Sequence, residues 1–320
     1  MAVYTEVPDD ALEAFVESYG LGEITAFKGI AEGVENSNFY LATTQGQFIL
    51  TLFEKRVAAR DLPFFVGLVE HLAERGIRCP VPVHDRQGVA IRELRGRPAT
   101  IFTFLDGLAV RRPNVRHCEK VGRLLGQLHV AGQDFKLQRV NALGPAGWAP
   151  LFAQFKDQAD DISPGLEALI SNELEALEHN WPRALPTGVI HADLFPDNLF
   201  FRREEISGVI DFYFACNEAY GYDLAICLNA WCFEADHSFN ITKGQALFRG
   251  YQAVRELTDV EREAMPLLAR GGALRFLLTR AFDWINTSSE ALVKPKPPLE
   301  YARRLRFHQT VETASGLGLM

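Results

Sequence analysis

The sequence lacks the features that mark secreted, membrane-spanning or nucleic-acid-binding chains. Its five cysteines are odd in number and form no Cys-x-x-Cys pair, so neither a disulfide framework nor a zinc site is expected. No apolar run approaches the roughly 18 residues needed to cross a bilayer, and no secretory signal is visible at the start. Acidic residues outnumber basic ones by 41 to 33, so the basic surface that duplex binding requires is missing. We expect a cytoplasmic protein that binds neither nucleic acid nor membrane; the oligomeric state is left open.

The chain is long enough for two globular parts. Its 320 residues are 48% hydrophobic and 23% charged, which is ordinary for a folded protein with a sizeable core. Strand-like segments dominate the first hundred residues, and helical patterns dominate beyond Leu105-Asp106-Gly107. We therefore expect an α+β fold, with a small antiparallel β part containing one inserted helix at residues 1–104 and a larger, mainly helical part at residues 105–320.

Hydrophobic spacing and turn residues predict the elements of both parts. In the first part the predicted helices are 7–19 and 61–75, and the predicted strands are 23–27, 38–43, 47–53, 89–93 and 98–104. In the second part the predicted helices are 115–131, 149–158, 165–180, 222–233, 243–256, 258–284 and 298–312, and the predicted strands are 188–201 and 205–212. The adjacent Gly271 and Gly272 predict a break in the helix over 258–284.

The most informative segment is His191-Ala192-Asp193, followed by Asn198 and flanked by apolar runs, with Asp211 at the end of the next strand. Its logic is that of phosphoryl transfer: one carboxylate takes the proton of an acceptor hydroxyl, while an amide oxygen and a second carboxylate hold Mg²⁺ against ATP. Asp193 and Asn198 would also suit a plain turn, but the combination favours catalysis. His191 belongs to this catalytic segment, where we expect it to brace the loop rather than to act as a base.

A second signal is the glycine-containing loop over residues 28–38. Gly29 and Gly33 allow the backbone to fold closely over a ligand, and Ser37 and Asn38 add short polar groups. The loop is neither a Walker A motif nor Gly-x-Gly-x-x-Gly. Alone, it is equally well explained as a hairpin loop, and it gains weight only from the acids downstream.

Together, the His-x-Asp segment with Asn198, the run Ile210-Asp211-Phe212 and the run Tyr222-Asp223-Leu224-Ala225 resemble the aminoglycoside phosphotransferase and choline kinase superfamily. That resemblance implies a protein-kinase-like fold of two lobes, with a nucleotide-binding N-lobe at 1–104 and a catalytic, acceptor-binding C-lobe at 105–320. Segments 29–39, 48–56 and 61–65 resemble the bacterial homoserine kinases of this superfamily.

The resemblance therefore implies ATP-dependent phosphorylation of the side-chain hydroxyl of L-homoserine, a step of threonine biosynthesis. Two alternatives stay open. One is another small-alcohol kinase, acting on choline, ethanolamine, methylthioribose or an aminoglycoside. The other is a nucleotide-binding pseudokinase.

The resemblance also assigns roles to individual positions. Asp193 would receive the acceptor proton, Asn198 and Asp211 would bind Mg²⁺, and Asp223 would tie the catalytic loop to the following helix. The residues that would lie over the ATP phosphates or line the adenine site are Gly29, Gly33, Ser37, Asn38, Phe102, Thr103 and Phe104.

One position departs from the superfamily pattern. A lysine usually lies on the third strand and pairs with a glutamate of the inserted helix, but Thr51 occupies that position here. Lys55 shares the strand face of Thr51 by alternation, although it would equally suit a solvated turn, and Glu70 aligns poorly with the usual partner. Thr51 and Lys55 are therefore candidates for holding the nucleotide in a different way.

Homoserine is a small zwitterion, so its site would need an acid for the ammonium and a cation for the carboxylate. Arg280, Asp283 and Trp284 share a face of one predicted helix, which would equally be explained by an ion pair beside a buried ring. Trp231 with Trp284 could instead cage the quaternary ammonium of choline. The candidate acceptor-binding residues are Tyr213, Glu218, Arg280, Asp283 and Trp284, and Asp223 and Arg275 are further charged residues of this lobe.

Overall fold

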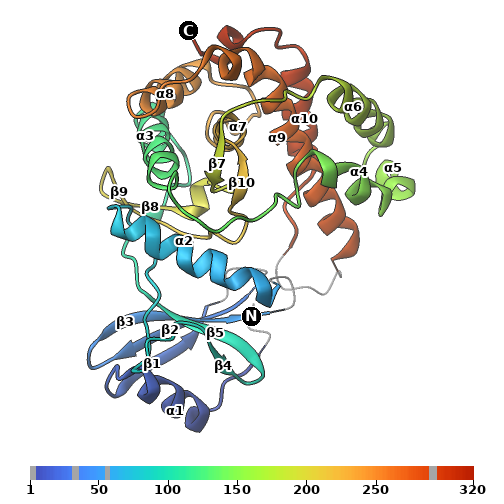
Figure 1. The fold of residues 1–320 in the computed structure, drawn as a ribbon. Coiled ribbons are helices and arrows are strands. Elements are labelled where there is room, and N and C mark those ends of the chain that lie inside the picture. Colours follow the sequence, from blue (N-terminus) through green and yellow to red (C-terminus); the bar gives the residue numbers. More distant parts are fainter. Residues whose placement is uncertain (1–4, 31–35, 55–57, 288–293) are drawn as a thin grey trace. The chain divides into compact units, whose positions relative to one another are not determined.

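The computed structural model describes residues 5–30, 36–54, 58–287 and 294–320. The chain forms two compact units, Met1–Gly107 with Ser207–Tyr213, and Leu108–Ile206 with Phe214–Met320. The first contains a five-stranded antiparallel sheet and the second consists mainly of helices (Figure 1), which confirms the expected α+β class. The segment Ser207–Tyr213, which carries Asp211, belongs to the first unit, whereas a division at residue 104 assigns it to the second.

The sheet of the first unit has the strand order β1-β2-β3-β5-β4. Its strands are β1 (Ile24–Gly29), β2 (Asn36–Thr43), β3 (Gly46–Phe53), β4 (Arg92–Leu94) and β5 (Arg97–Thr103). Thr43 pairs with Gly46, so β2 and β3 form a tight hairpin. Arg95 and Gly96 both have positive φ between β4 and β5, as a type I′ hairpin turn requires.

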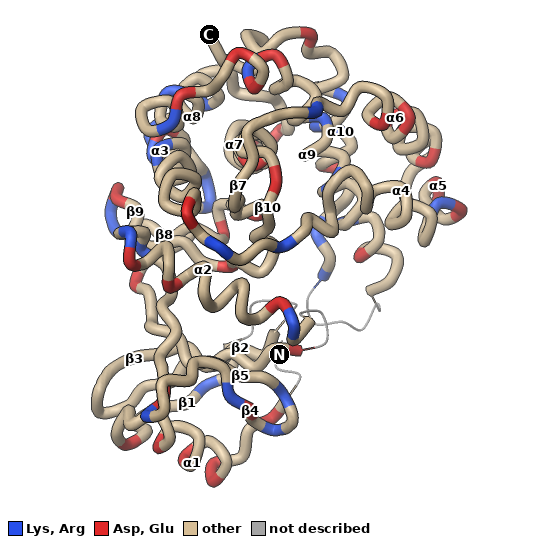
Figure 2. The backbone as a smooth tube through the Cα atoms, viewed as in Figure 1, with Lys and Arg blue, Asp and Glu red and all other residues tan. Residues whose placement is uncertain are grey.

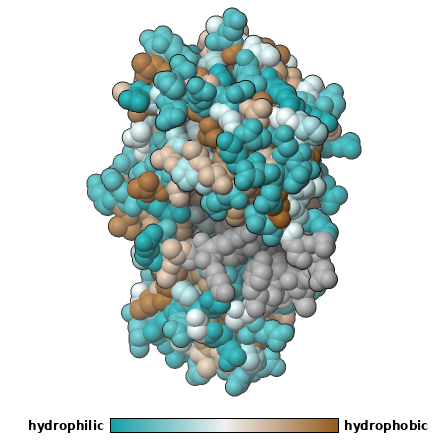
Figure 3. All heavy atoms as spheres, turned by 90° about the vertical axis from the view of Figure 1, so that its right-hand side faces the viewer, coloured by the Kyte–Doolittle hydropathy of each residue, from teal (hydrophilic) through white to brown (hydrophobic). Residues whose placement is uncertain are grey.

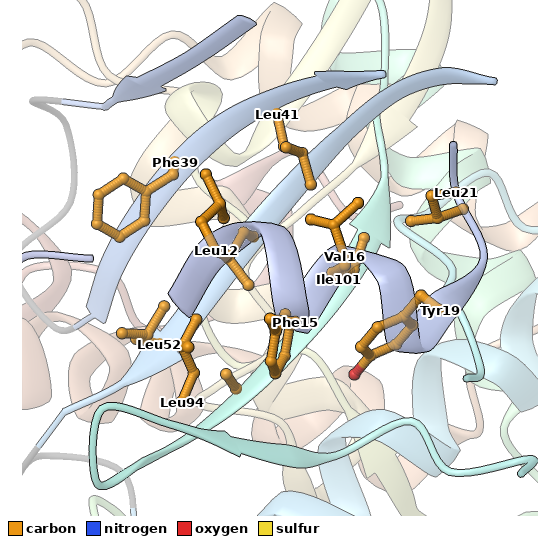
Figure 4. Close-up of a cluster of buried hydrophobic side chains, with 12 residues drawn as sticks. Leu12, Phe15, Val16, Tyr19, Leu21, Phe39, Leu41, Leu52, Leu94 and Ile101 are labelled. Atoms are coloured by element: carbon orange, nitrogen blue, oxygen red, sulfur yellow. The ribbon is translucent and has the colours of Figure 1, made fainter. Parts of the chain in front are cut away.

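Helix α1 (Asp9–Tyr19) packs on one face of this sheet, as Figure 4 shows. Alternation along the strands places Leu41, Leu50 and Ile101 on that face, where they are fully buried with Phe15 and Val16 of the helix. The helix ends at Gly20, whose φ of 68° is left-handed. The register pairs Asn38 with Thr51 and Thr51 with Thr100, so the opposite face carries a row of polar residues.

The remaining elements of the first unit are η1 (Ala59–Asp61) and α2 (Leu62–Glu74). Helix α2 buries an apolar face that includes Phe65. The ring of Tyr213 lies edge-on to Phe65 and Phe53, with centroids 5.7 and 5.8 Å apart. The segment that follows Asp211 is thus packed between α2 and β3.

The second unit is built around long helices. Its helical elements are α3 (Val115–Ala131), α4 (Pro145–Ala153), η2 (Lys156–Gln158), α5 (Ala159–Ile162), α6 (Leu166–Asn180), η3 (Pro196–Asn198), α7 (Tyr220–Trp231), α8 (Ile241–Gln252), α9 (Asp259–Asn286), α10 (Leu299–Gln309) and η4 (Ala314–Leu317). Helices α3 and α8 approach closely because each presents a glycine: a Cβ on Gly122 would lie 2.0 Å from the Leu247 carbonyl oxygen, and one on Gly250 would lie 1.9 Å from that of Glu119.

The predicted break at Gly271-Gly272 is wrong, because α9 runs unbroken from Asp259 to Asn286. The two glycines serve packing instead. A Cβ on Gly271 would lie 2.3 Å from the ring of Trp181, and one on Gly272 would lie 3.3 Å from the Asn229 amide. Each glycine costs about 1 kcal/mol in helix propensity. The close approach of the neighbouring elements explains why glycine is nevertheless found here.

Two small sheets frame the segment around Asp193. Strands β7 (Thr187–Ile190) and β10 (Cys216–Ala219) pair antiparallel, and β6 (Leu108–Ala109), β8 (Leu199–Arg202) and β9 (Glu205–Val209) form a second sheet in the order β6-β8-β9. The strand expected over 188–201 is thus two strands separated by a loop. The hydrophobic pattern did not predict β6 or β10, because β6 is very short and β10 has Asn217 and Glu218 at its centre.

Acidic and basic residues are both scattered along the backbone of the two units (Figure 2). Hydrophilic residues predominate on the face seen in Figure 3, with hydrophobic residues scattered among them. Among the described residues, no helix combines the length and the apolar character needed to cross a membrane.

Candidate active site

The loop between β7 and β8 brings Asp193 and Asn198 together. The side-chain amide of Asn198 donates to the carbonyl oxygen of Asp193 at 2.8 Å and to its carboxylate Oδ2 at 3.0 Å. Residues 196–198 form the 3₁₀ turn η3, which directs the Asn198 side chain back along the loop. The spacing of four intervening residues thus brings the two side chains into contact.

His191 braces this loop. Its side chain is 3% exposed, and its Nδ1 accepts a hydrogen bond from the backbone N–H of Asp193 at 3.2 Å. A ring nitrogen used in this way orients the Asp193 backbone, which agrees with the bracing role expected from the sequence.

Ala192, between these two residues, has a φ of 63°, an uncommon value for a side chain with a Cβ. Asp223 of α7 holds it there: the Asp223 carboxylate accepts the N–H groups of His191 and Ala192, both at 2.8 Å. On the other side of Ala192, Nη1 of the buried Arg275 donates to the Ala192 carbonyl. The residue before Asp193 is thus held from both sides, as strained positions at functional sites require.

A buried network supports Asp223. Nε2 of His129 lies 3.1 Å from the Asp223 carboxylate, and Nδ1 of His129 lies 2.7 Å from the hydroxyl of Tyr251. Burial alone would raise the pKa of Asp223, but the hydrogen bonds from His129 and from the loop backbone keep that pKa below its usual value. Burial lowers the pKa of His129 against the opposing effect of Asp223. Asp223 is therefore an ionised, fully buried anchor for the loop.

Trp231 supports the same loop from the end of α7. It is fully buried, and its indole N–H donates to the carbonyl of Leu194 at 2.8 Å. A ring in this position cannot form an ammonium cage with Trp284, which is 45% exposed. The cage that kept choline as an alternative acceptor is therefore wrong for this pair.

Part of the predicted nucleotide-binding surface lies outside the described residues, namely Gly33 and Lys55. Gly29 ends β1 and pairs with Phe39 of β2. The hydroxyl of Ser37 is fully buried and donates to Glu54 at 2.7 Å, and the hydroxyl of Thr5 also donates to this carboxylate, at 2.8 Å. Ser37 therefore fastens the strand after the glycine loop to the end of β3.

Thr51, which the resemblance assigns to the position of the superfamily lysine, forms a neutral pair with Asn38. The Thr51 hydroxyl donates to Oδ1 of Asn38 at 2.8 Å, and Thr51 is 2% exposed. Glu70 of α2 instead contacts Nε2 of His84, and hydrogen bonds to Gly88 and Glu70 raise the pKa of that histidine. The described residues thus offer Asn38 and Thr51, rather than a lysine–glutamate pair, on this face of the sheet.

The three residues predicted to line the adenine site end β5 and begin the linker. Thr103 is bound twice to Val81, with its backbone N–H donating to the Val81 carbonyl and its hydroxyl accepting from the Val81 N–H, both at 2.9 Å. Phe102 is buried. Phe104 is 37% exposed, and its ring lies edge-on to Tyr40 with centroids 5.7 Å apart.

Asp211 follows β9 in the first unit and has a φ of 65°, so its backbone is also left-handed. Among the described residues, no group of three or more His, Cys, Asp or Glu side chains could hold a metal ion. The candidate ligands, Asn198 and Asp211, offer side-chain oxygens. Mg²⁺ prefers oxygen ligands and takes several of them from water and phosphate. Asn198 fits, because its amide nitrogen makes both contacts to Asp193 and its Oδ1 makes no hydrogen bond within the described residues.

The predicted acceptor-binding residues are distributed over both units. Tyr213 packs in the first unit, as described above, and the others lie in the second. Glu218 of β10 is half-buried and accepts from the Asn141 amide at 3.2 Å and from the Ala219 N–H at 2.9 Å. Arg280 pairs with Glu300 of α10 at 2.5 Å and lies 4.4 Å over the Tyr301 ring, so its charge is already balanced. Asp283 is half-buried on the same helix.

The arrangement is that of a phosphotransferase, and the comparisons agree. The profile of the phosphotransferase enzyme family matches residues 26–257. The chain belongs to this family.

Relatives that match over the full length specify which kind of phosphotransferase the chain resembles. The chain is 60% identical over 319 residues to a homoserine kinase of Xanthobacter autotrophicus, covering 100% of this chain and 99% of that one. It is 61% identical over 318 residues to a homoserine kinase of Methylobacterium, covering 99% of each chain.

Solved structures share the fold at low identity. A spectinomycin phosphotransferase superposes with a TM-score of 0.70 at 14% identity, covering 98% of each chain. A choline kinase of Cryptosporidium parvum gives 0.65 at 15% identity, covering 89% of this chain and 88% of that one. The expected protein-kinase-like fold is thereby confirmed.

Proposed function

We propose that this protein transfers the γ-phosphoryl group of ATP to the side-chain hydroxyl of L-homoserine, as a step of threonine biosynthesis. Full-length identity of about 60% to several homoserine kinases supports this acceptor. The observation that carries the chemistry is the fixed pair Asp193 and Asn198 in a loop whose backbone is held by Asp223. The first unit would bind the nucleotide, and the second would bind the acceptor.

Asp193 is the proposed base. It would orient the acceptor hydroxyl and take its proton as the phosphoryl group is transferred, and positioning supplies most of the catalysis in this chemistry. The hydrogen bond from Asn198 fixes one carboxylate oxygen, Oδ2, and thereby the plane of the group. Asp193 would then present its carboxylate to the acceptor in a fixed orientation.

Asn198 and Asp211 would hold Mg²⁺ through an amide oxygen and a carboxylate. The bound ion supplies neutralisation of the phosphate charges. Gly29 and Asn38 would lie near the phosphates, with Thr51 in place of the usual lysine. The described members of this set are neutral, and Lys55, the cationic candidate, lies outside the described residues.

The five cysteines are free thiols and all are buried. Reduced, buried thiols fit a reducing compartment. We place the protein in the cytoplasm on this ground, with a small-molecule acceptor as its partner.

An ADP-release assay with L-homoserine, choline, ethanolamine, methylthioribose and an aminoglycoside, each with ATP and Mg²⁺, tests the assignment. Homoserine should give the highest kcat/KM. Asp193→Ala should lower kcat by about 10²- to 10⁴-fold while nucleotide binding, followed by calorimetry, is retained. Highest turnover with another acceptor would replace homoserine, and ATP binding without ADP release for any acceptor would indicate a pseudokinase.

A further inference from the structure

Three arginines recur at five-residue intervals along α9, and two of them have carboxylate partners. Arg270 binds Glu173 through two parallel contacts, Nε to Oε1 at 2.7 Å and Nη2 to Oε2 at 2.8 Å. Arg280 pairs with Glu300 of α10. The charges of Arg270 and Arg280 are thus each balanced by a carboxylate.

Arg275, between them, has no carboxylate partner among the described residues. It is 2% exposed, and its one hydrogen bond runs from Nη1 to the carbonyl of Ala192. Its Nε is buried and finds no acceptor in the described part of the chain. The rings of Phe276 and Phe214 lie 4.5 and 5.4 Å from the guanidinium carbon. These rings offset only part of the desolvation of the cation.

An unbalanced guanidinium in such surroundings is energetically costly. A single backbone carbonyl does not need a full charge, since a neutral amide side chain could donate to it. The edge of Arg275 without a partner consists of Nε and Nη2, and this is the edge that Arg270 uses to hold Glu173. Among the described residues this edge has no partner, so it could take one more carboxylate in the bidentate manner typical of arginine.

The location of Arg275 fits an acceptor molecule. Its Nη1 donates to the carbonyl of the residue directly before Asp193, so Arg275 contacts the loop that carries the proposed base. Tyr222 is a second polar group in this region, and its buried hydroxyl also finds no partner among the described residues. Burial raises the pKa of Tyr222, the charge of Arg275 opposes this, and the charge of Glu218 adds to it. The positive charge of Arg275 and the negative charge of Glu218 thus both affect the pKa of Tyr222.

We propose that the Nε–Nη2 edge of Arg275 binds the carboxylate of the acceptor amino acid and so places its hydroxyl at Asp193. This deepens the proposed function and depends on it, because an acceptor without a carboxylate would make no use of the site. Glu218, which is half-buried in the same unit, would face the ammonium group. Arg275 replaces Arg280 as the cation expected from the sequence.

The test compares two acceptors that differ only in the carboxylate, L-homoserine and 3-aminopropanol. The wild-type protein should favour homoserine in kcat/KM by about 100-fold, the loss typical of a broken buried charge pair. In Arg275→Gln this preference should fall to within about threefold: loss of the contact to Ala192 slows both acceptors alike, and homoserine alone also loses the partner of its carboxylate. Arg270→Gln is the matched control: it removes a paired arginine of the same helix and should leave the ratio unchanged.

Arg275→Lys covers the case in which the glutamine variant does not fold. Lysine keeps the positive charge but lacks the two parallel N–H donors of the guanidinium. The preference of this variant for homoserine should therefore fall about tenfold. The proposal is overturned if either variant lowers kcat/KM equally for both acceptors, since that indicates a purely structural contact to Ala192. It is also overturned if the wild-type protein does not discriminate between the two. No turnover of homoserine by the wild-type protein would instead refute the proposed function.

Discussion

The side-chain amide of Asn198 donates two hydrogen bonds to Asp193, one to the backbone carbonyl and one to the carboxylate. One residue therefore sets both the course of the loop and the direction of the proposed base. The remaining oxygen of that amide is the proposed metal ligand, so the position of the base and the position of the metal are coupled through a single side chain.

Asn198→Ala should uncouple them. We expect kcat to fall by at least about 100-fold, because the carboxylate loses its orientation, and the Mg²⁺ concentration for half-maximal rate to rise, because an oxygen ligand is gone. Steady-state rates over a magnesium titration measure both effects. A variant with reduced kcat and an unchanged magnesium requirement would contradict the assignment of Asn198 to the metal.

Asp223→Asn should destabilise the protein as well as slow it. The carboxylate accepts two backbone N–H groups and contacts His129, and an amide in its place would turn an N–H group towards a donor. Loss of a buried charged acceptor costs about 3 kcal/mol, measurable by urea unfolding. Asp236→Asn is the control, because Asp236 is exposed and bonds only within its own turn to Ser238. Equal losses from the two variants would refute the anchoring role of Asp223.

Stability should fall on mild acidification because of His308. Burial lowers the pKa of this histidine to about 3, against 6.5 in the unfolded chain. Below pH 6.5 the unfolded state binds the proton more readily, so the free energy of unfolding drops by about 1.4 kcal/mol per pH unit until the folded pKa is reached. Between pH 7 and pH 5 this amounts to about 2 kcal/mol. The His308→Gln variant should lack this part of the pH dependence of the unfolding free energy. If the unfolding free energies of both proteins changed in parallel with pH, the role of His308 would be disproved.

Gly271→Ala should lower the melting temperature although alanine is the better helix former. The new methyl group would lie 2.3 Å from the Trp181 ring, and overpacking of this kind costs about 1–3 kcal/mol. Gly272→Ala is matched in helix propensity and meets its nearest neighbour at 3.3 Å, so its loss should be clearly smaller. Scanning calorimetry of the two variants makes the comparison, and a more stable Gly271→Ala would show that Trp181 can move aside.

Local patterns were enough to predict most elements and the core of the catalytic loop. The predicted helix over 115–131 matches α3 (Val115–Ala131), because a long amphipathic stripe is the strongest signal a sequence carries. The sequence singled out Asp193 and Asn198 as one motif in a short loop, but not the hydrogen bonds between them. Strand β10 was missed because its centre is polar and its pairing partner, β7, lies about thirty residues away.

The supports of the loop could not be predicted, because each depends on contacts between distant segments. Arg275 meets Ala192 across 83 positions of sequence, and Trp231 meets Leu194 across 37. The replacement of a lysine by a Thr51–Asn38 hydrogen bond required the register of β2 against β3. Helical spacing suggested Arg280 as the acceptor cation, but spacing could not reveal that Glu300 already balances it.

The short return of the chain through Ser207–Tyr213 has a consequence for dissecting the molecule. The backbone passes between the two units three times, at 107/108, at 206/207 and at 213/214. A single cut after Gly107 would therefore release neither unit intact: residues 1–107 would lack the segment with Asp211, and residues 108–320 would carry that segment away from Phe53 and Phe65. The two units are interlaced in sequence, and we expect them to be inherited, expressed and folded only as a pair.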